Sequence, residues 1–129
     1  MKITPVLFVD AIEPSLPFWM NTLGFELMAQ VPEADRLGFV ILKKGEAELM
    51  LQTRQSVRKD LGQAADRVLT QSASLYVEVD RFGALRPVDD IGLPQRDTAY
   101  GMREIFVREP QGHVVGLAAS VDASQAEAV

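Results

Sequence analysis

The alternation of apolar and polar positions predicts four strands and one helix in the first half of the chain. The predicted strands are Ile3–Val9, Phe25–Val31, Leu37–Lys43 and Glu46–Thr53. The helix is predicted after the first strand, from apolar residues that recur three or four positions apart: Leu16, Trp19, Met20 and Leu23. Pro14 suits the first turn of this helix, and Gly24 suits its end. The first half is therefore predicted to form a β-α-β-β-β unit.

The second half repeats this order of elements. Its predicted strands are Ser74–Asp80, Pro94–Thr98, Met102–Arg108 and His113–Ala119, with a short helix over Phe82–Ile91. Glu109–Gly112 has proline second and glycine fourth, which is typical of a type I turn. Between the halves, Arg54–Ser72 is polar and charged, and it is predicted to be a solvated linker with a short amphipathic helix. We expect modules at 1–53 and 73–120, this linker at 54–72 and a flexible tail at 121–129, all within one structural domain.

The order of these elements predicts an α+β fold built from paired βαβββ modules. Two four-stranded units of this kind can form a curved mixed sheet with the helices on its convex side. The concave side of such a sheet is a groove, which is a common place for a small-molecule ligand.

Strand alternation separates the side chains expected in the core from those expected in the groove. In the strand Glu46–Thr53, Leu49 and Leu51 belong to the core side, so Glu48 and Met50 face the groove. In Met102–Arg108, the more apolar set of Ile105 and Val107 is assigned to the core. The candidate pocket residues on the groove side are Thr4, Val6, Glu48, Met50, Ser74, Tyr76, Met102, Glu104, Phe106 and Gly116.

Composition and charge exclude several classes of protein. Hydrophobic residues make up 47% of the 129 residues, which excludes general disorder. The absence of cysteine excludes a disulfide scaffold, a thiolate zinc site and a cysteine nucleophile, and one histidine excludes any site that needs two from a single chain. A net charge of −5 argues against binding to nucleic acid or to an anionic membrane. The apolar runs are too short to cross a bilayer and no signal peptide is apparent, so a cytoplasmic protein is expected.

Several single residues have both a functional and a structural interpretation. Glu48 is a partner for a ligand, or a general base if burial raises its pKa, or simply a solvated carboxylate. Phe18 and Trp19 lie at helical spacing and are expected in the core. His113 is expected to be a turn or surface residue that faces away from the groove. Arg103 is a candidate for binding an anionic group, with a surface salt bridge as the structural alternative.

The sequence resembles the glyoxalase/bleomycin-resistance/extradiol-dioxygenase superfamily, also called the vicinal oxygen chelate proteins. The segments that carry the resemblance are Thr4–Asp10, Ser15–Phe25, Ala47–Gln52, Ser74–Asp80 and Tyr100–His113. The most specific parts are the helix segment that ends in Leu-Gly-Phe and the turn Glu-Pro-Gln-Gly-His. The resemblance covers nearly the whole chain, and it implies paired βαβββ modules, a homodimer and pockets in the concave sheets.

Metalloenzymes of this superfamily that resemble glyoxalase I carry one metal ligand on each of four strands. The resemblance places these positions at Thr4, Glu48, Ser74 and Gly116. Of these, Glu48 alone is a normal ligand for a divalent ion, because neutral hydroxyls bind nickel or zinc poorly and glycine has no side chain. The two-histidine triad of the family dioxygenases is also excluded by the single histidine.

The sequence therefore predicts a protein that binds a drug-like or metabolite-like small molecule without a metal or other cofactor. The resemblance links this interpretation to the bleomycin-resistance-like branch of the superfamily. Two alternatives remain open: a metal-dependent lyase, isomerase or dioxygenase with non-standard ligands, and a degenerate domain that mainly dimerises. The expected partners are a small-molecule ligand and a second copy of the chain, with no nucleic acid and no membrane.

Overall fold

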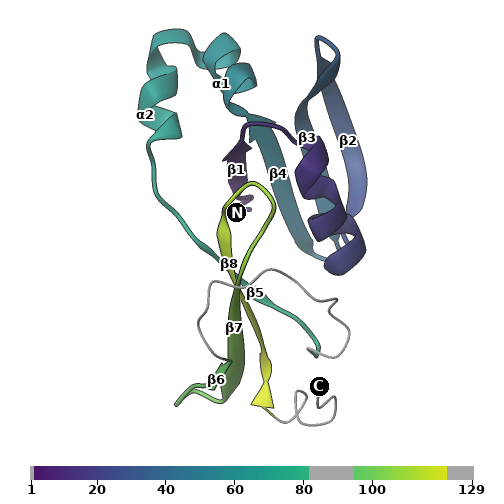
Figure 1. Ribbon diagram of the computed structural model, residues 1–129, viewed down its shortest axis with the longest axis vertical. Coiled ribbons are helices and arrows are strands. Elements are labelled where there is room, and N and C mark those ends of the chain that lie inside the picture. Colours follow the sequence, from purple (N-terminus) through teal and green to yellow (C-terminus); the bar gives the residue numbers. More distant parts are fainter. Residues whose placement is uncertain (1, 82–94, 122–129) are drawn as a thin grey trace. The chain divides into compact units, whose positions relative to one another are not determined.

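The computed structural model describes residues 2–81 and 95–121 (Figure 1). The chain divides into two compact units, Met1–Ser72, here called unit 1, and Ala73–Val129, here called unit 2. Each unit contains one four-stranded mixed sheet. The predicted helix over Phe82–Ile91 and nearly all of the predicted tail lie outside the described residues.

The strands of unit 1 follow the predicted order. They are β1 (Val6–Val9), β2 (Glu26–Glu33), β3 (Arg36–Lys44) and β4 (Ala47–Thr53). Their order in the sheet is β1-β4-β3-β2, with β1 parallel to β4 and the other pairs antiparallel (Figure 1). Gly45 forms the tight connection between β3 and β4 with a φ of 57°, a backbone conformation that glycine adopts without steric cost.

The predicted α-helix after β1 is wrong in type. The segment forms a short 3-10 turn, η1 (Glu13–Ser15), followed by a π-helix, η2 (Pro17–Thr22). The amide of Leu23 donates to the carbonyl of Phe18, five residues earlier, at 3.1 Å. Pro17 has no N–H to continue the hydrogen bonds of the preceding turn, so a regular α-helix cannot run through it. The end of the helix agrees with the prediction, because Gly24 has a φ of 80°.

The core of unit 1 lies between its sheet and these short helices. The buried apolar side chains of the sheet are Leu7, Val9, Val40, Leu42, Leu49 and Leu51. Trp19 is 1% exposed, and its ring makes edge-to-face contacts with Phe18 and Phe25 at centroid distances of 5.0 and 5.7 Å. Such contacts stabilise aromatic clusters beyond the area that they bury. The core role expected for Phe18 and Trp19 is therefore present in the structure.

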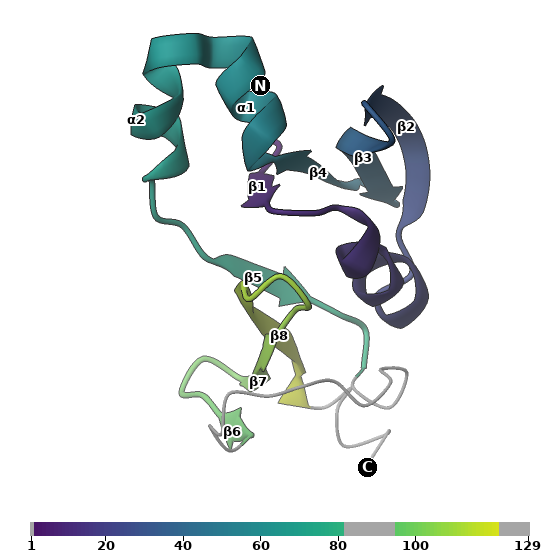
Figure 2. The ribbon, with the colours of Figure 1, turned by 45° about the horizontal axis from the view of Figure 1, so that its top comes forward.

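The segment after β4 contains more helix than the sequence predicts. It forms α1 (Arg54–Leu61), a 3-10 turn η3 (Gly62–Ala64) and α2 (Ala65–Leu69), and Figure 2 shows α2 running back beside α1. Thr53 caps α1, since its hydroxyl oxygen accepts a hydrogen bond from the amide of Ser56 at 3.0 Å. Val57 and Ala65 are buried, so this segment packs as part of unit 1 rather than as a solvated linker.

Unit 2 repeats the topology of unit 1. Its strands are β5 (Leu75–Glu78), β6 (Arg96–Asp97), β7 (Met102–Arg108) and β8 (Val114–Ser120). Their order is β5-β8-β7-β6, with β5 parallel to β8. The type I turn predicted between β7 and β8 agrees with the hydrogen bond from the amide of Gly112 to the carbonyl of Glu109, at 2.8 Å. The predicted α+β class is confirmed, and no helix in the described parts of the chain is long and apolar enough to cross a membrane.

Candidate functional site

One face of the unit 1 sheet carries the four pocket residues predicted in the first half of the chain. The strand register pairs Val6 with Met50 and Met50 with Ile41, so these side chains form one row across the sheet. Glu48 lies two residues before Met50 on β4, and Thr4 lies two residues before Val6, ahead of β1. The Thr4 hydroxyl is 3.5 Å from the Glu48 carboxylate. The opposite face carries the buried Leu49 and Leu51. The structure therefore brings these four predicted residues together on the face that points away from the core.

The Glu48 carboxylate is engaged by a cation of its own chain. The Lys2 ammonium donates to Glu48 Oε2 at 2.9 Å, and the Glu48 side chain is 15% exposed. The hydrogen bond from Lys2 lowers the pKa of Glu48, and this effect exceeds the opposing effect of burial. The condition for the general-base interpretation of Glu48, a pKa raised by burial, is therefore not met.

A cleft of about 540 Å³ lies farther along the same face of unit 1. Its floor comes from the row in which Val31, Phe39 and Gln52 are paired, and its wall comes from α1. The cleft is lined by Val31, Glu33, Phe39, Gln52, Ser56, Lys59 and Asp60. Lys59 forms an ion pair with Glu33 at 3.5 Å, and the Gln52 amide donates to the Ser56 hydroxyl at 3.1 Å. The cleft thus combines aliphatic and aromatic surface with polar groups, which is the usual composition of a small-molecule pocket.

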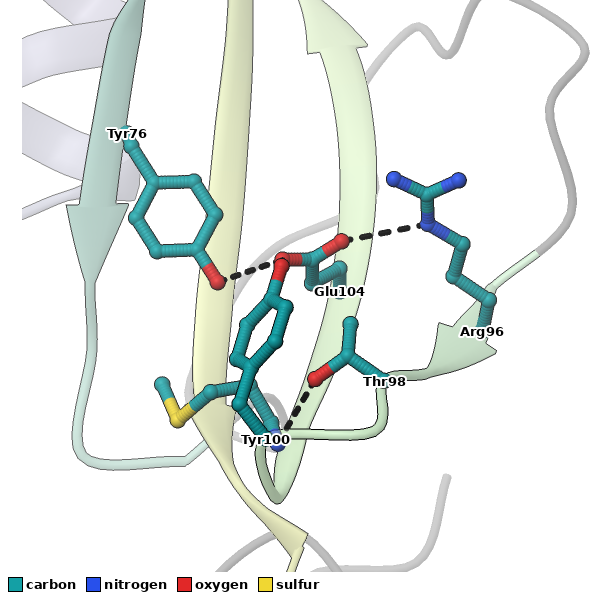
Figure 3. Close-up of polar contacts among 6 residues, drawn as sticks. Tyr76, Arg96, Thr98, Tyr100 and Glu104 are labelled. Atoms are coloured by element: carbon teal, nitrogen blue, oxygen red, sulfur yellow. Dashed lines mark hydrogen bonds and ion pairs between the residues drawn. The ribbon is translucent and has the colours of Figure 1, made fainter.

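In unit 2, the central feature of the predicted groove face is the carboxylate of Glu104, which is 1% exposed (Figure 3). The Tyr76 and Tyr100 hydroxyls both donate to Glu104 Oε2, at 2.5 and 2.7 Å. Arg96 donates through Nε to Glu104 Oε1 at 3.1 Å. These distances for the phenols are those of charge-assisted hydrogen bonds. We call Tyr76, Arg96, Tyr100 and Glu104 the Glu104 cluster.

The cluster fixes the protonation states of its members. The hydrogen bonds from Tyr76 and Tyr100 lower the pKa of Glu104, more than burial raises it. The hydrogen bond to Glu104 in turn raises the pKa of the Tyr76 phenol. Glu104 is therefore an ionised carboxylate and Tyr76 a neutral phenol across the physiological range. A carboxylate with three donors already in place orients the groups around it rather than abstracting protons.

The rings of Tyr76 and Phe106 cover Gly116 on the same face of unit 2. The strand register places Gly116 opposite both residues, Tyr76 on β5 and Phe106 on β7. A Cβ atom at Gly116 would lie 3.0 Å from Phe106 Cε1 and 3.3 Å from Tyr76 Cδ1. Any larger side chain at this position must displace one or both rings. The Arg96 guanidinium lies 5.4 Å from the centroid of the Phe106 ring, which extends this aromatic surface toward β6.

The remaining predicted residues of unit 2 have smaller parts in this arrangement. Met102 lies two residues before Glu104 at the start of β7, and Ser74 lies directly before β5 and is exposed. Arg103 forms a two-pronged ion pair with Asp97 at 2.7 and 3.0 Å, which agrees with its structural interpretation. The amide of His113 donates to the Glu109 carboxylate at 3.1 Å, as expected for a residue of the turn.

Sequence reasoning missed Arg96 and the residues that line the cleft, and it did not connect Tyr100 with Glu104. Tyr100 reaches Glu104 because a tight turn follows β6, in which the amide of Gly101 donates to the carbonyl of Thr98 at 3.2 Å. Gly101 has a φ of 83°, so glycine next to tyrosine was the available signal for this turn. For the cleft, the available signal was strand alternation, which puts Gln52 on the same face of β4 as Glu48.

The comparison with protein families shows to which superfamily the chain belongs. Residues 3–117 match the model of the Glyoxalase/Bleomycin resistance protein/Dioxygenase superfamily. The chain belongs to this superfamily. The resemblance deduced from the sequence is therefore confirmed. No curated protein is significantly similar in sequence to this superfamily member.

Solved structures of the same superfamily share the fold at low sequence identity. A glyoxalase/bleomycin resistance protein/dioxygenase from Nocardioides is 22% identical over 95% of this chain and 85% of its own, with a TM-score of 0.67. A bleomycin-binding protein from Streptomyces verticillus, in complex with copper(II)-bleomycin, is 24% identical over 93% of this chain and 96% of its own, with a TM-score of 0.60. A lactoylglutathione lyase from Agrobacterium tumefaciens is 16% identical over 92% of both chains, with a TM-score of 0.65.

The residues present at the family's metal-ligand positions do not fit a metal ion. Glu48 is bound by the Lys2 ammonium, and its neighbour Thr4 offers a neutral hydroxyl. Gly116 offers no side-chain ligand, and the rings of Tyr76 and Phe106 crowd the position of a Cβ atom there, at 3.3 and 3.0 Å. Among residues 2–81 and 95–121, no group of three or more histidine, aspartate or glutamate side chains is arranged to hold a metal.

Proposed function

We propose that this superfamily member binds a small molecule on the exposed faces of its sheets, and that it does so without a metal ion. One observation carries the proposal: the rings of Tyr76 and Phe106 crowd the Cβ position of Gly116, the residue that stands where a metal-ligating carboxylate is expected. The same rings that exclude such a side chain offer a surface for the flat part of a ligand. At this one of the four positions, a hydrophobic contact surface stands in place of a ligand side chain.

The cleft of unit 1 supports binding over a purely structural role. A degenerate domain that only dimerises would fill its own pocket with side chains, whereas about 540 Å³ remains open beside Phe39 and Gln52. A volume of this size is within the range that drug-sized ligands occupy. The bleomycin-binding relative from Streptomyces verticillus provides a precedent for binding within this fold.

The proposal is tested by titrating the full chain with a panel of aromatic and cationic small molecules, including metal-free bleomycin, in excess EDTA. Isothermal titration calorimetry is expected to give saturable binding of at least one compound. A second titration, in EDTA-free buffer with added nickel or zinc, is expected to give the same affinity. A Phe106→Leu variant should weaken compounds that bind to unit 2, whereas Thr70→Val, which changes an exposed residue of unit 1, should not. The proposal is overturned if no compound saturates, or if binding appears only after metal is added.

We further propose that the chain forms a homodimer, an expectation that rests on the superfamily rather than on a contact in this structure. Light scattering coupled to size-exclusion chromatography tests it directly. A mass of twice that of one chain is expected, and a mass of one chain at the highest accessible concentration would contradict it.

A further inference from the structure

The hydrogen-bond directions in the Glu104 cluster define what a ligand can offer to it. A tyrosine hydroxyl has one proton to donate and lone pairs with which it accepts. Tyr76 and Tyr100 both donate that proton to Glu104 Oε2. Each phenol oxygen is therefore left as an acceptor toward any other group. A ligand that reaches these oxygens must supply the protons itself.

The accessible part of the cluster is the pair of phenols and not the carboxylate. Tyr76 is 47% exposed and Tyr100 is 68% exposed, whereas Glu104 is 1% exposed. A hydroxyl that donates to an anion is polarised, which strengthens it as an acceptor. Arg96 binds the other carboxylate oxygen, and Figure 3 shows it on the opposite side of the Glu104 carboxylate from Tyr76. The acceptor pair and the guanidinium are thus separate features of one face.

We propose that unit 2 selects a planar aromatic ligand carrying an N–H donor group, such as an amidine or a primary amide, which hydrogen-bonds to the oxygens of Tyr76 and Tyr100. Two N–H bonds on one nitrogen-containing group match two acceptors that surround one carboxylate oxygen. A carboxylate on the same ring has no proton to donate, so it is repelled by the lone pairs on the Tyr76 and Tyr100 oxygens. This inference rests on the proposed binding function and deepens it by naming the ligand class.

Benzamidine and benzoate are matched probes for this selectivity, because they share a ring and differ in the polar group. Ligand-observed NMR titrations of the full chain in EDTA are expected to show tighter binding of benzamidine than of benzoate. Tyr76→Phe and Tyr100→Phe each remove one acceptor, and each should weaken benzamidine by about threefold to tenfold. The Thr70→Val variant is the matched control, since it removes one exposed hydroxyl from unit 1, and it should leave both affinities unchanged.

Glu104→Gln gives a sharper test because it should reverse the selectivity. Arg96 Nε needs an acceptor, so the carboxamide oxygen should face Arg96 and its NH2 group should face the two phenols. The phenols then accept from the NH2 group, and their own protons turn toward the ligand. Benzoate is expected to bind this variant more tightly than benzamidine. A side chain with only a structural role would weaken both probes equally.

Circular dichroism melting of each variant confirms that it is folded before its affinity is interpreted. The inference is overturned if benzoate binds the natural chain at least as tightly as benzamidine, if Tyr76→Phe and Tyr100→Phe leave benzamidine binding unchanged, or if Glu104→Gln keeps the original preference. Failure of both probes to bind also overturns it. Saturable binding of another compound in the broad panel would then still support the proposed function, so the two failures are distinguishable.

Discussion

The two units of this chain have the same sheet topology, but the carboxylates on their sheets have different surroundings. Each unit orders its strands as first, fourth, third and second, with the first strand parallel to the fourth. In unit 1, Glu48 pairs with Lys2, whose side chain is 67% exposed. In unit 2, Glu104 is buried beneath two phenols and a guanidinium.

This difference shows that topology does not determine the chemistry of the face. Both pKa values are lowered, yet by different causes: an ammonium ion in unit 1 and two phenol hydrogen bonds in unit 2. A single exposed lysine such as Lys2 is easily exchanged for solvent or a ligand, whereas a buried carboxylate with three donors holds its neighbours in fixed directions. The fixed neighbours of Glu104 give unit 2 an oriented aromatic surface, whereas the open cleft of unit 1 lies beside Phe39 and Gln52.

Truncation of the two cores should have the largest effect on stability. Leu51 in unit 1 and Leu117 in unit 2 are both 0% exposed at the centre of their sheets. Leu51→Ala and Leu117→Ala are each expected to lower the free energy of unfolding by about 2–5 kcal/mol, because each leaves a cavity in a packed core. Urea unfolding measures both losses. A loss below about 1 kcal/mol for either variant would contradict the view that both units have close-packed cores.

A carboxylate introduced at Gly116 should have the next largest effect. Gly116→Glu is expected to lower the free energy of unfolding by about 1–3 kcal/mol, because the new side chain must displace the rings of Tyr76 and Phe106. Gly116→Ala adds only the Cβ atom and should cost less. Chemical denaturation of both variants gives the comparison. If the glutamate variant is as stable as the natural chain, the rings do not close this position.

The two carboxylates should also differ in how much they contribute to the loss of stability in acid. This effect should be smaller than those of the core and Gly116 substitutions. Because the folded-state pKa of Glu104 lies below 4.5, its carboxylate stabilises the folded chain fully above that pH. This contribution is lost as the pH falls below 4.5 and through the folded-state pKa. Glu104→Gln should therefore flatten the decline of the melting temperature with falling pH. Glu48→Gln should flatten it less, because the partner of Glu48 is the exposed Lys2. An equal slope for both variants would contradict this ranking.

Removal of the Lys2 side chain should have the smallest effect on stability, but it should still change the pKa of Glu48. Lys2→Met removes the hydrogen bond that lowers the pKa of Glu48, so that pKa should rise toward its ordinary value of 4.5. The melting temperature should change little, because the Lys2 side chain is 67% exposed. A carboxyl-detected NMR titration follows Glu48 directly. A pKa that stays where it is in the natural chain would show that Lys2 does not set it.

The sequence predicted the sheets well because the side chains of a strand alternate with a period of two, and one face of each of these strands is apolar. Leu49, Leu51 and Val107 are buried as expected, and Glu48 and Glu104 lie on the opposite faces of their strands. The helix after β1 was predicted in place but not in type, because a 3.6-residue pattern does not reveal that Pro17 divides the segment.

The candidate sites were predictable only where a strand carries them. Tyr76, Glu104, Phe106 and Gly116 share a face because their strands are in register. Tyr100 and Arg96 reach the same carboxylate through a turn and a two-residue strand, which have too few residues to show a period. The helices over Arg54–Leu69 were underestimated because few of their residues are apolar, although Val57 and Ala65 anchor them.

The measurement that tests the central claim most directly is the metal content of the full chain purified without a metal-affinity tag. Inductively coupled plasma mass spectrometry is made before and after incubation with nickel, zinc, manganese or iron and removal of excess ion. The account predicts well under one metal ion per chain in every sample, because Glu48 is paired with Lys2 and Gly116 is covered by rings. One tightly bound ion per chain would contradict the account and would favour an enzyme with unusual ligands.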